Sequence, residues 1–427
     1  MAPPRPGPLV EPAPELTRRQ SARAERQMLL PGFGAEAQRR LAAARVLVIG
    51  AGGLGSACVP YLVGAGVGSG ERADGRHGAI GVVDDDVVEL SNLHRQIAHG
   101  TADVGRSKVD SIVETALAID PGARIEPHAR RLTAGNALEL FAGYDLVIDG
   151  SDNFPTRYLA NDAAELTGIP LVWGAILQYH GQLGVAWHAH GPGYRDLFPR
   201  PPAPEDVLDC GAGGVLPGLC GTVGSLLATE AMKLIAGLGE PLIGRVLLYD
   251  ALAARTRELE IRRDPQAVPV TGLVDYELFC AGGGTAGREA GDGDASAAAR
   301  PVAVDAAGLA AELRSGRAVR LIDVRTAEEH RRRRIAGAES LPLAELEELL
   351  AAGVGTGGGA GAAEELLSGP PILHCERDPR SIRAAMLIAE AGFASEAEGA
   401  PGVRYLRGGI RALAEVAPEL VEEEGAP

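Results

Sequence analysis

The stretch that decides the fold is VLVIGAGGLGS at residues 46–56, where a short aliphatic run leads directly into a cluster of glycines. The aliphatic residues favour an extended strand, and the glycines allow a tight turn and a close approach of the backbone to a ligand. A strand, a glycine turn and a helix in this order present backbone N–H groups to a phosphate or a ribose. By itself the pattern leaves open a dinucleotide cofactor, another nucleotide or a purely structural turn.

Strand-like and helix-like segments alternate outward from this stretch. IGVVD (80–84) and LVID (146–149) are apolar runs that end in aspartate, and residues 107–120 between them have helical periodicity. The apolar residues expected on one face of that helix are Val109, Ile112, Val113, Ala116 and Leu117. The alternation predicts a Rossmann-like α/β fold with a mainly parallel sheet that helices cover on both faces.

A second, smaller α/β pattern follows in VRLIDVR (319–325), PILHC (371–375) and VRYLRGG (403–409), with a helix between the last two. A low-complexity segment rich in Gly, Ala, Asp and Ser separates the two patterns, and the N-terminus is rich in Pro and Arg. The predicted organisation is a flexible tail at 1–21, a first domain at 22–280, a linker at 281–300 and a second domain at 301–427.

Composition and charge narrow the classes of function. The chain has 427 residues, 46% hydrophobic and 23% charged, which is typical of a soluble protein with two or three domains. A net charge of −16 argues against a nucleic-acid or anionic-membrane partner. The five cysteines form no CxxC pair, and we find neither a signal-peptide core nor a membrane-spanning apolar run. We therefore expect a cytoplasmic protein with reduced thiols.

Several polar residues around the first pattern suit a nucleotide triphosphate. Asp84 ends the strand after the glycine turn, where it could accept hydrogen bonds from ribose hydroxyls or simply be a solvated carboxylate. A polar insert, SGERADGRHG (69–78), explains its distance from the glycines. Arg95 and Lys108 supply positive charge for phosphates, and Asp152, at a strand end, is a carboxylate that suits Mg²⁺. Each fits a surface charge, but the ordered set favours ATP over a nicotinamide cofactor.

Residues 22–265 resemble the ThiF/MoeB-type adenylyltransferases, which are relatives of the ubiquitin-activating enzymes. The motifs that carry the resemblance are RQMLLPGFG (26–34), VLVIGAGGLGS (46–56), VDDDVVELSNLHRQ (83–96), VGRSKVD (104–110), DGSDNFPTRYLAND (149–162) and CGAGGVLPGLCGTVGSLLATEAMKL (210–234). The resemblance implies that ATP and Mg²⁺ are used to adenylylate the C-terminal glycine of a small ubiquitin-like sulfur-carrier protein ending in Gly-Gly, with release of pyrophosphate.

The resemblance also assigns site residues. Asp84 would hold the ribose, Asp152 would coordinate Mg²⁺, and Asn92, Arg95 and Lys108 would contact phosphates. The full set expected at the nucleotide is Gly50, Gly52, Gly53, Gly55, Asp84, Asp86, Ser91, Asn92, Leu93, His94, Arg95, Lys108, Asp152 and Asn153. Arg26 matches an arginine that reaches into the site of the partner subunit, which implies a homodimer.

The chain departs from this family at its structural zinc site. The first of the two CxxC pairs is replaced by Gly193 and Asp196, and the second is missing near 264–272. We therefore expect no structural zinc. Cys210 matches a cysteine that some members link covalently to the activated carrier, and a buried structural cysteine is an equal alternative. Cys220 and Cys58 are expected to be core residues.

Cys375 lies between the strand PILH and a helix that begins near 381, in the loop CERDPR (375–380). Because Arg377 and Arg380 flank a thiol at a helix N-terminus, we expect the pKa of Cys375 to be lowered and the thiolate to carry a persulfide. The alternative is an ordinary half-buried cysteine. The sulfur donor would be a cysteine desulfurase or thiosulfate.

Residues 301–420 resemble a rhodanese domain, in LIDVRTAEEH (321–330), IAGAESLPL (335–343), the Cys375 loop and LRGGIRALAE (406–415). The six-residue loop from Cys375 to Arg380 matches the sulfurtransferase subclass. Two positions depart from the usual pattern, since Asp378 replaces a glycine and Arg334 replaces a histidine.

An adenylylating domain followed by a rhodanese domain is the arrangement of proteins that convert a carrier C-terminus to a thiocarboxylate, for molybdenum cofactor synthesis or another sulfur insertion. Two other classes remain open. One is a nicotinamide-dependent oxidoreductase with an appended rhodanese module, which leaves Arg95 and Lys108 unexplained. The other is a non-catalytic scaffold that binds ubiquitin-like carriers, which the lost zinc site and Asp378 would favour.

Overall fold

The computed structural model describes residues 6–202, 213–280, 301–316, 319–355, 371–391 and 403–423. Two compact units are present. The described residues up to Arg200, together with those from Gly213 to Val274, form the first unit, and the residues from Asp275 onward belong to the second. Each unit has its own sheet and its own hydrophobic core.

The first unit is built on an eight-stranded sheet in the order β3-β2-β1-β4-β5-β6-β7-β8. Its strands are β1 (Arg45–Ile49), β2 (Ala79–Val83), β3 (Ile125–His128), β4 (Leu146–Asp149), β5 (Leu171–Leu177), β6 (His180–Ala186), β7 (Arg245–Asp250) and β8 (Arg255–Glu260). β1 to β5 pair in parallel, and β6 to β8 continue the sheet antiparallel. The predicted fold class, a mainly parallel α/β sheet, is confirmed.

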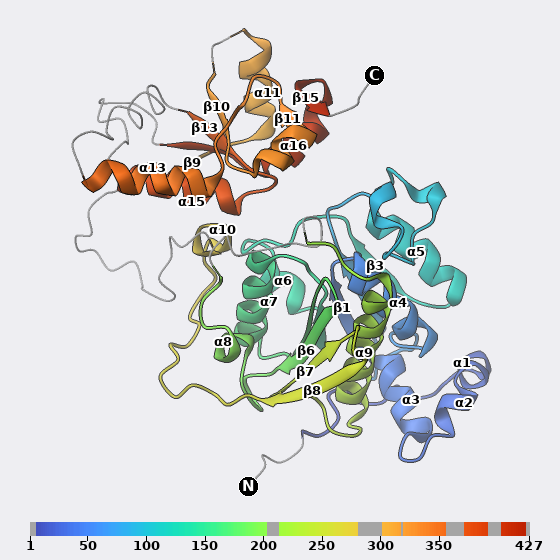
Figure 1. Ribbon diagram of the computed structural model, residues 1–427. Helices are drawn as coiled ribbons and strands as arrows, with labels where there is room; N and C mark the ends of the chain where they lie inside the picture. The colour runs from blue at the N-terminus through green and yellow to red at the C-terminus, as the bar shows by residue number, and fades with distance from the viewer. Residues whose placement is uncertain are drawn as a thin grey trace. The chain divides into compact units, whose positions relative to one another are not determined.

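Helices cover both faces of this sheet. The helices described in this unit are α1 (Arg18–Arg23), α2 (Glu25–Met28), α3 (Gly34–Ala43), α4 (Gly53–Gly64), α5 (Lys108–Ile119), α6 (Ala137–Phe141), α7 (Phe154–Thr167), α8 (Tyr194–Leu197) and α9 (Pro217–Ala236). Figure 1 shows α6 and α7 on one side of the sheet and α4 and α9 on the other. Among the described residues, α9 is the one helix that is long and apolar enough to cross a membrane, but 61% of its apolar window is buried in the unit, as in a core helix.

The amphipathic helix expected at 107–120 is present as α5. Val109, Ile112 and Ala116 are fully buried, as predicted, and Val113 is half-buried. Leu117 is 39% exposed, so its assignment to the buried face was wrong. The physical reason is that α5 packs mainly against α4 and β3 at one edge of the sheet, which leaves its buried stripe narrow.

The second unit contains a five-stranded parallel sheet in the order β12-β10-β13-β14-β9. Its strands are β9 (Val302–Val304), β10 (Leu321–Asp323), β12 (Glu339–Ser340), β13 (Ile372–His374) and β14 (Arg404–Leu406), and β11 (Arg333–Ile335) pairs separately with β15 (Val421–Glu423). Its helices are α10 (Tyr276–Leu278), α11 (Ala306–Arg314), α12 (Ala327–Arg332), α13 (Leu343–Gly355), α15 (Pro379–Glu390) and α16 (Gly409–Val416).

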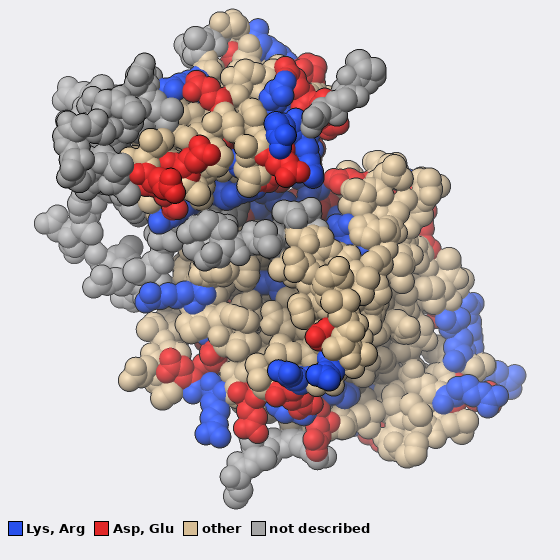
Figure 2. All heavy atoms as spheres, in the orientation of Figure 1, with Lys and Arg blue, Asp and Glu red and all other residues tan. Residues whose placement is uncertain are grey.

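Two apolar clusters hold this second sheet. One joins β10 and β13 to α13 and α15, and the other joins the same strands to α11 and α16. The second α/β unit therefore has helices on both faces of its sheet. On the face shown in Figure 2, acidic and basic side chains are interspersed over the surface of each unit.

Candidate nucleotide and sulfur sites

The glycine loop lies where the order of the first sheet reverses. β1 lies between β2 and β4. The chain adds β2 and β3 on one side of β1 and then adds β4 and the later strands on the other side. Crevices at such reversals, beyond the carboxyl ends of the strands, are the usual ligand sites of open α/β sheets. Gly50 has a φ of +87°, and a Cβ at Gly55 would stand 1.9 Å from the Gly50 oxygen. Both positions therefore require glycine.

Asp84 holds the glycine loop through its backbone. Its Oδ2 accepts a hydrogen bond from the Ala51 N–H at 2.7 Å, and its Oδ1 accepts one from the Asp86 N–H at 2.7 Å. Burial raises the pKa of Asp84, while the nearby charge of Lys108 acts in the opposite direction. The structure thus places Asp84 beside the loop, where each carboxylate oxygen already has one backbone donor.

Lys108 is buried at the start of α5, with its Nζ 2.9 Å from the Oδ2 of Asp86. Carboxylate oxygens of Asp84, Asp85 and Asp86 all lie within 4.8 Å of one another. Lys108 balances part of this negative charge. Two of the predicted nucleotide residues, Asp86 and Lys108, are therefore brought together with Asp84 next to the glycine loop.

His99 is a residue of this site that the sequence interpretation missed. Its Nε2 lies 2.9 Å from the Ala51 carbonyl oxygen, and its Nδ1 lies 2.8 Å from the Ser111 hydroxyl. Burial lowers the pKa of His99, so the ring is neutral. A carbonyl only accepts, so Nε2 carries a proton that it donates to Ala51. No short motif marks His99 in the sequence, because its partners Ser111 and Ala51 lie 12 and 48 positions away.

The segment between β2 and α5 carries the other predicted phosphate residues. Asn92 is buried at the end of a short 3₁₀ turn (Leu90–Asn92), and Leu93 and Arg95 are half-buried. Arg95 Nη1 donates to the Ser91 carbonyl at 3.2 Å, and His94 Nδ1 lies 2.9 Å from the same oxygen. The carbonyl of Ser91 therefore orients both side chains.

Asp152 follows β4 at the same edge of the sheet and is exposed. Asn153 has a different role in this structure, because its Oδ1 caps α7 by accepting the Thr156 N–H at 2.9 Å. Arg157, which the sequence interpretation missed, is buried and donates to the Ser151 and Gly174 carbonyls at 2.7 and 2.9 Å. It holds the turn that presents Asp152.

Arg26 is not part of its own chain's glycine loop. It is exposed on α2, and its neighbour Gln27 donates to the Ala65 carbonyl at the C-terminal end of α4. The glycine loop lies at the other end of α4, which at about 1.5 Å per residue spans about 18 Å. The structure therefore separates Arg26 from the other predicted residues.

The structure describes two cysteines of the first unit, Cys58 and Cys220. Cys58 and Cys220 are buried in the core, as expected, and burial raises the pKa of Cys58 strongly. Cys220 packs against the glycine loop, with its Sγ 3.0 Å from where a Cβ at Gly53 would stand. Cys210 lies outside the described residues.

Polar contacts join the two segments where the zinc ligands would stand. Asp196 accepts the Gly193 N–H at 2.7 Å and the Asp264 N–H at 2.8 Å. Arg263 donates to the Gly191 carbonyl at 2.6 Å and also contacts the His188 carbonyl. These side chains connect the same stretches of backbone without a metal ligand set.

Cys375 directly follows β13 and is 1% exposed. Its loop is pinned by the start of α16, where the Ile410 N–H donates to the Cys375 carbonyl at 2.9 Å. Gly409, with a φ of +62°, passes so close that a Cβ there would lie 2.4 Å from the same oxygen. The predicted loop, with Arg380 one residue into α15, is present.

The expected lowering of the Cys375 pKa is wrong in this structure. Burial raises the pKa of the thiol, and the charge of Asp378 adds to this, whereas Arg380 and Ser381 act in the opposite direction. The sequence showed the neighbouring arginines but not the burial of the sulfur. The Sγ of Cys375 is buried and lies 3.5 Å from the Ser381 hydroxyl.

The two departures from the rhodanese pattern have structural explanations. Asp378 is buried, and its Oδ1 accepts the Gly408 N–H at 2.6 Å, which ties the loop to the start of α16. Arg334 forms an ion pair with Glu422 between β11 and β15. Neither side chain is an isolated charge.

A network of ion pairs holds the Cys375 loop through the residue that follows the cysteine. Arg325 is 2% exposed and donates to Asp323 through Nε and Nη2 and to Glu376 through Nη1 at 2.9 Å. Arg333 binds the other oxygen of Glu376 at 2.7 Å. Glu376, directly after Cys375, was missed by the sequence interpretation, although two arginines hold it in place.

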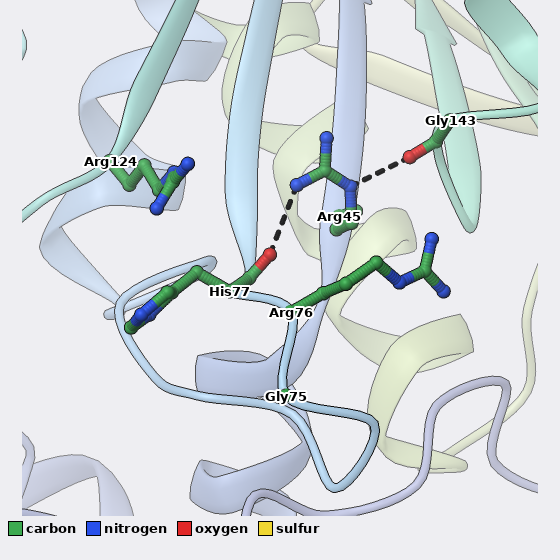
Figure 3. Close-up of a pocket in the computed structure, with 6 residues that line it drawn as sticks. All are labelled: Arg45, Gly75, Arg76, His77, Arg124 and Gly143. Atoms are coloured by element: carbon green, nitrogen blue, oxygen red, sulfur yellow. Dashed lines mark hydrogen bonds between the residues drawn. The ribbon is translucent and has the colours of Figure 1, made fainter.

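A cavity of about 370 Å³ lies at the opposite, amino-terminal edge of the first sheet (Figure 3). It is lined by Arg45, Gly75, Arg76, His77, Arg124 and Gly143. Arg45 donates to the Gly143 carbonyl at 2.7 Å and to the His77 carbonyl at 3.0 Å, and Arg76 pairs with Asp74. Arg45 therefore ties the 69–78 insert to the sheet, away from the glycine loop.

Known proteins resemble both units. A model of the ThiF family matches residues 24–270, and a model of the rhodanese-like domain matches residues 305–415. The probable adenylyltransferase/sulfurtransferase MoeZ of Mycobacterium tuberculosis is 43% identical over 419 residues, 97% of this chain and 98% of that protein. The sulfur carrier protein adenylyltransferase of Thermus thermophilus is 50% identical over 276 residues, 62% of this chain and 98% of that protein.

One solved structure adds support for the fold of the first unit. The crystal structure of Escherichia coli MccB with AMPCPP and MccA has a TM-score of 0.51 over 60% of this chain and 75% of that chain. At 17% identity, this likeness shows a shared fold alone.

Proposed function

Because the chain belongs to the ThiF family and joins an adenylyltransferase to a rhodanese-like sulfurtransferase, we propose that it activates a small sulfur-carrier protein and loads it with sulfur. The proposed product is a thiocarboxylate at the carrier's C-terminal glycine. The observation that carries the proposal is that one chain holds both sites. The glycine loop stands with Asp84 and Lys108, and the Cys375 loop lies in the second unit.

In the first step, a carboxylate oxygen of the carrier's terminal glycine attacks the α-phosphorus of ATP. A P–O bond forms to the carrier, the bond to the β-phosphate oxygen breaks, and pyrophosphate leaves. Arg95 and Lys108 would offset the negative charge of the phosphates, and alignment of the reactants supplies the rest of the acceleration. Asp84 would accept from the ribose with the lone pairs that its backbone donors leave free.

Magnesium would be held by Asp152. An exposed carboxylate at the carboxyl edge of the sheet is the kind of oxygen ligand that Mg²⁺ prefers, alongside the phosphates themselves. When bound, the ion neutralises phosphate charge. Arg157 keeps the Asp152 turn in place through the Ser151 carbonyl.

In the second step, the terminal sulfur of a Cys375 persulfide attacks the carrier's acyl-adenylate. A C–S bond forms, the C–O bond to AMP breaks, and AMP leaves. A second thiol then attacks the Cys375 sulfur, which frees the carrier as a thiocarboxylate and leaves a mixed disulfide for a further thiol to reduce. The persulfide would come from a cysteine desulfurase or from thiosulfate.

We further propose that the protein acts as a homodimer on the small subunit of molybdopterin synthase or a related carrier. Arg26 lies far from its own glycine loop, which supports a role in the partner's site. Leu29 and Leu30 beside it are 69% and 55% exposed, and Leu90 and Ile97 are each 71% exposed. Burial of these apolar side chains would stabilise such an interface.

The test is ATP–pyrophosphate exchange with purified protein and a panel of small carriers that end in Gly-Gly. We expect exchange that depends on one carrier and is abolished by Asp152→Ala, while Cys375→Ala leaves exchange intact and abolishes sulfur transfer. Absence of exchange with every carrier, in a protein that binds ATP, would favour the scaffold function.

A further inference from the structure

Arg380, the last residue of the Cys375 loop, is bound by a carboxylate from another element. Its Nη1 and Nη2 donate to the two oxygens of Glu329 at 2.8 and 2.7 Å. Glu329 belongs to α12, and both side chains are about three-quarters buried. Two parallel hydrogen bonds of this kind fix the orientation of a guanidinium as well as its position.

Glu329 is itself held in place. Its Oε2 accepts hydrogen bonds from the Thr326 N–H at 3.0 Å and from the Thr326 hydroxyl at 2.9 Å, which completes a capping box at the start of α12. Burial would raise the pKa of Glu329, but the hydrogen bonds and charge of Arg380 outweigh it and lower the pKa to about 2. The carboxylate is therefore ionised at neutral pH and offsets the charge of Arg380.

The hydrogen bonds of Ser381 are consistent with a protonated Cys375 thiol. The Ser381 hydroxyl donates to the Asp378 carbonyl at 3.0 Å and lies 3.5 Å from the Sγ of Cys375. A hydroxyl has one hydrogen, so the Cys375 S–H is left to donate to the Ser381 oxygen. The two side chains that could stabilise a thiolate each have another acceptor, the Asp378 carbonyl for Ser381 and Glu329 for Arg380, while the Ser381 N–H still favours the thiolate.

We propose that Glu329 is a positioning residue that keeps Cys375 in the thiol form by binding Arg380. The inference rests on the proposed sulfur-transfer function of this site. Among the described residues, the charged and titratable groups around the loop include Asp323, Arg325, Glu329, His330, Arg333, His374, Glu376, Arg377, Asp378, Arg380, Tyr405, Arg407 and Arg411. Burial is the main reason that Cys375 is a thiol, and Arg380 is the charge that most opposes it, so a carboxylate bound to Arg380 weakens that opposition.

Glu329→Gln tests this directly in the full-length protein. Glutamine can still complete a capping box, so the start of α12 is kept and only the negative charge is removed. Glu328 is the matched control, because it is exposed on the same helix and pairs with Arg332. Glu329→Asp, which keeps the charge, guards against a purely structural effect.

The measurement is the rate at which iodoacetamide alkylates Cys375, followed by peptide mass spectrometry as a function of pH. We expect E329Q to shift the profile down by about one pH unit, which is about a tenfold faster rate on the rising part of the profile. E328Q and E329D should follow the wild type. An unchanged or upward-shifted profile in E329Q overturns the proposal. The profile does not depend on turnover, so loss of thiosulfate:cyanide transfer in the wild type would instead count against the proposed function.

Discussion

The side chains of Asp84 and His99 hold the backbone of the glycine loop. Ala51 is held through both of its backbone polar groups. Its N–H donates to Asp84, and its carbonyl accepts from His99. This fixes the chain between Gly50 and Gly52, where phosphates are proposed to approach. Asp84, whose carboxylate is expected to bind the ribose, therefore also holds the glycine loop.

Asp84→Asn is expected to weaken ATP binding about tenfold or more. An amide has one acceptor oxygen, so either Ala51 or Asp86 would face an NH₂ group instead of an acceptor, and hydrogen bonds to charged groups are worth about 1.5–3 kcal/mol. Calorimetric titration with ATP measures the change. Asp85→Asn, at the exposed neighbour, is the control, and equal affinities in the two variants would contradict the role of Asp84.

His374 makes the stability of the second unit depend on pH. Burial lowers its pKa to about 4, while the unfolded chain titrates near about 6.5. As the pH falls below 6.5, His374 becomes protonated in the unfolded state but stays neutral in the folded state. The contribution of His374 to the free energy of unfolding is therefore complete above pH 6.5 and is lost as the pH falls toward 4. The loss is about 2 kcal/mol by pH 5.

Calorimetry of the wild type and His374→Leu at pH 7.5 and 5.0 checks this. Both tryptophans lie in the first unit, so fluorescence would miss the transition of the second. We expect acidification to lower the melting temperature of the second unit more in the wild type than in H374L. Equal shifts in the two proteins would show that His374 is not the cause.

At the scale of elements, α8 and its loop show how the first unit is held where family members bind zinc. Tyr194 on α8 packs edge-on against Trp173 of β5 and Tyr158 of α7. Arg195 binds Asp162 of α7 through two hydrogen bonds of 2.7 Å. Together with the contacts of Asp196, these side chains anchor the segment to the sheet. The expectation that no structural zinc is bound stays a prediction.

Asp196→Ala is expected to destabilise the first unit by about 1–2 kcal/mol, since two backbone N–H groups lose their acceptor. The measurement is urea unfolding followed by tryptophan fluorescence, which reports on this unit. Hydrogen exchange should quicken in residues 188–198 and 262–267. Asp110→Ala, an exposed carboxylate on α5, serves as control, and equal stability of the two variants would show that the contact is dispensable.

At the scale of the whole molecule, each unit has its own sheet, core and candidate chemistry. The proposed role of Arg26 requires a second chain, because α2 lies at the end of α4 opposite the glycine loop. A symmetric dimer would place the same arginine of each chain at the other chain's site. The proposed activating reaction would then belong to the dimer.

Subunit mixing tests this arrangement. Arg26→Ala and Asp152→Ala should each be inactive alone in carrier-dependent exchange. If the arginine acts across the dimer, a mixed dimer has one complete site, and random mixing in equal amounts should restore about a quarter of the wild-type rate. No recovery after confirmed subunit exchange would rule out a role for Arg26 in the partner's site.

The sequence by itself determined the fold class, the position of the glycine turn and the position of the cysteine loop. These features depend on short contiguous patterns, such as the aliphatic run at 46–49 followed by glycines and the strand before Cys375. Strand, turn and helix preferences act over a few neighbouring residues, so they can be recognised without knowing the tertiary structure.

Only the tertiary structure decided the state of the side chains within those sites. Burial raises the pKa of Cys375 where its sequence neighbours suggested the reverse, and Glu329 binds Arg380 across 51 positions of the chain. The two contacts that hold Ala51 come from 33 and 48 residues away. Desolvation and ion pairing depend on which distant residues the packed fold brings into contact, and local sequence patterns do not encode that proximity.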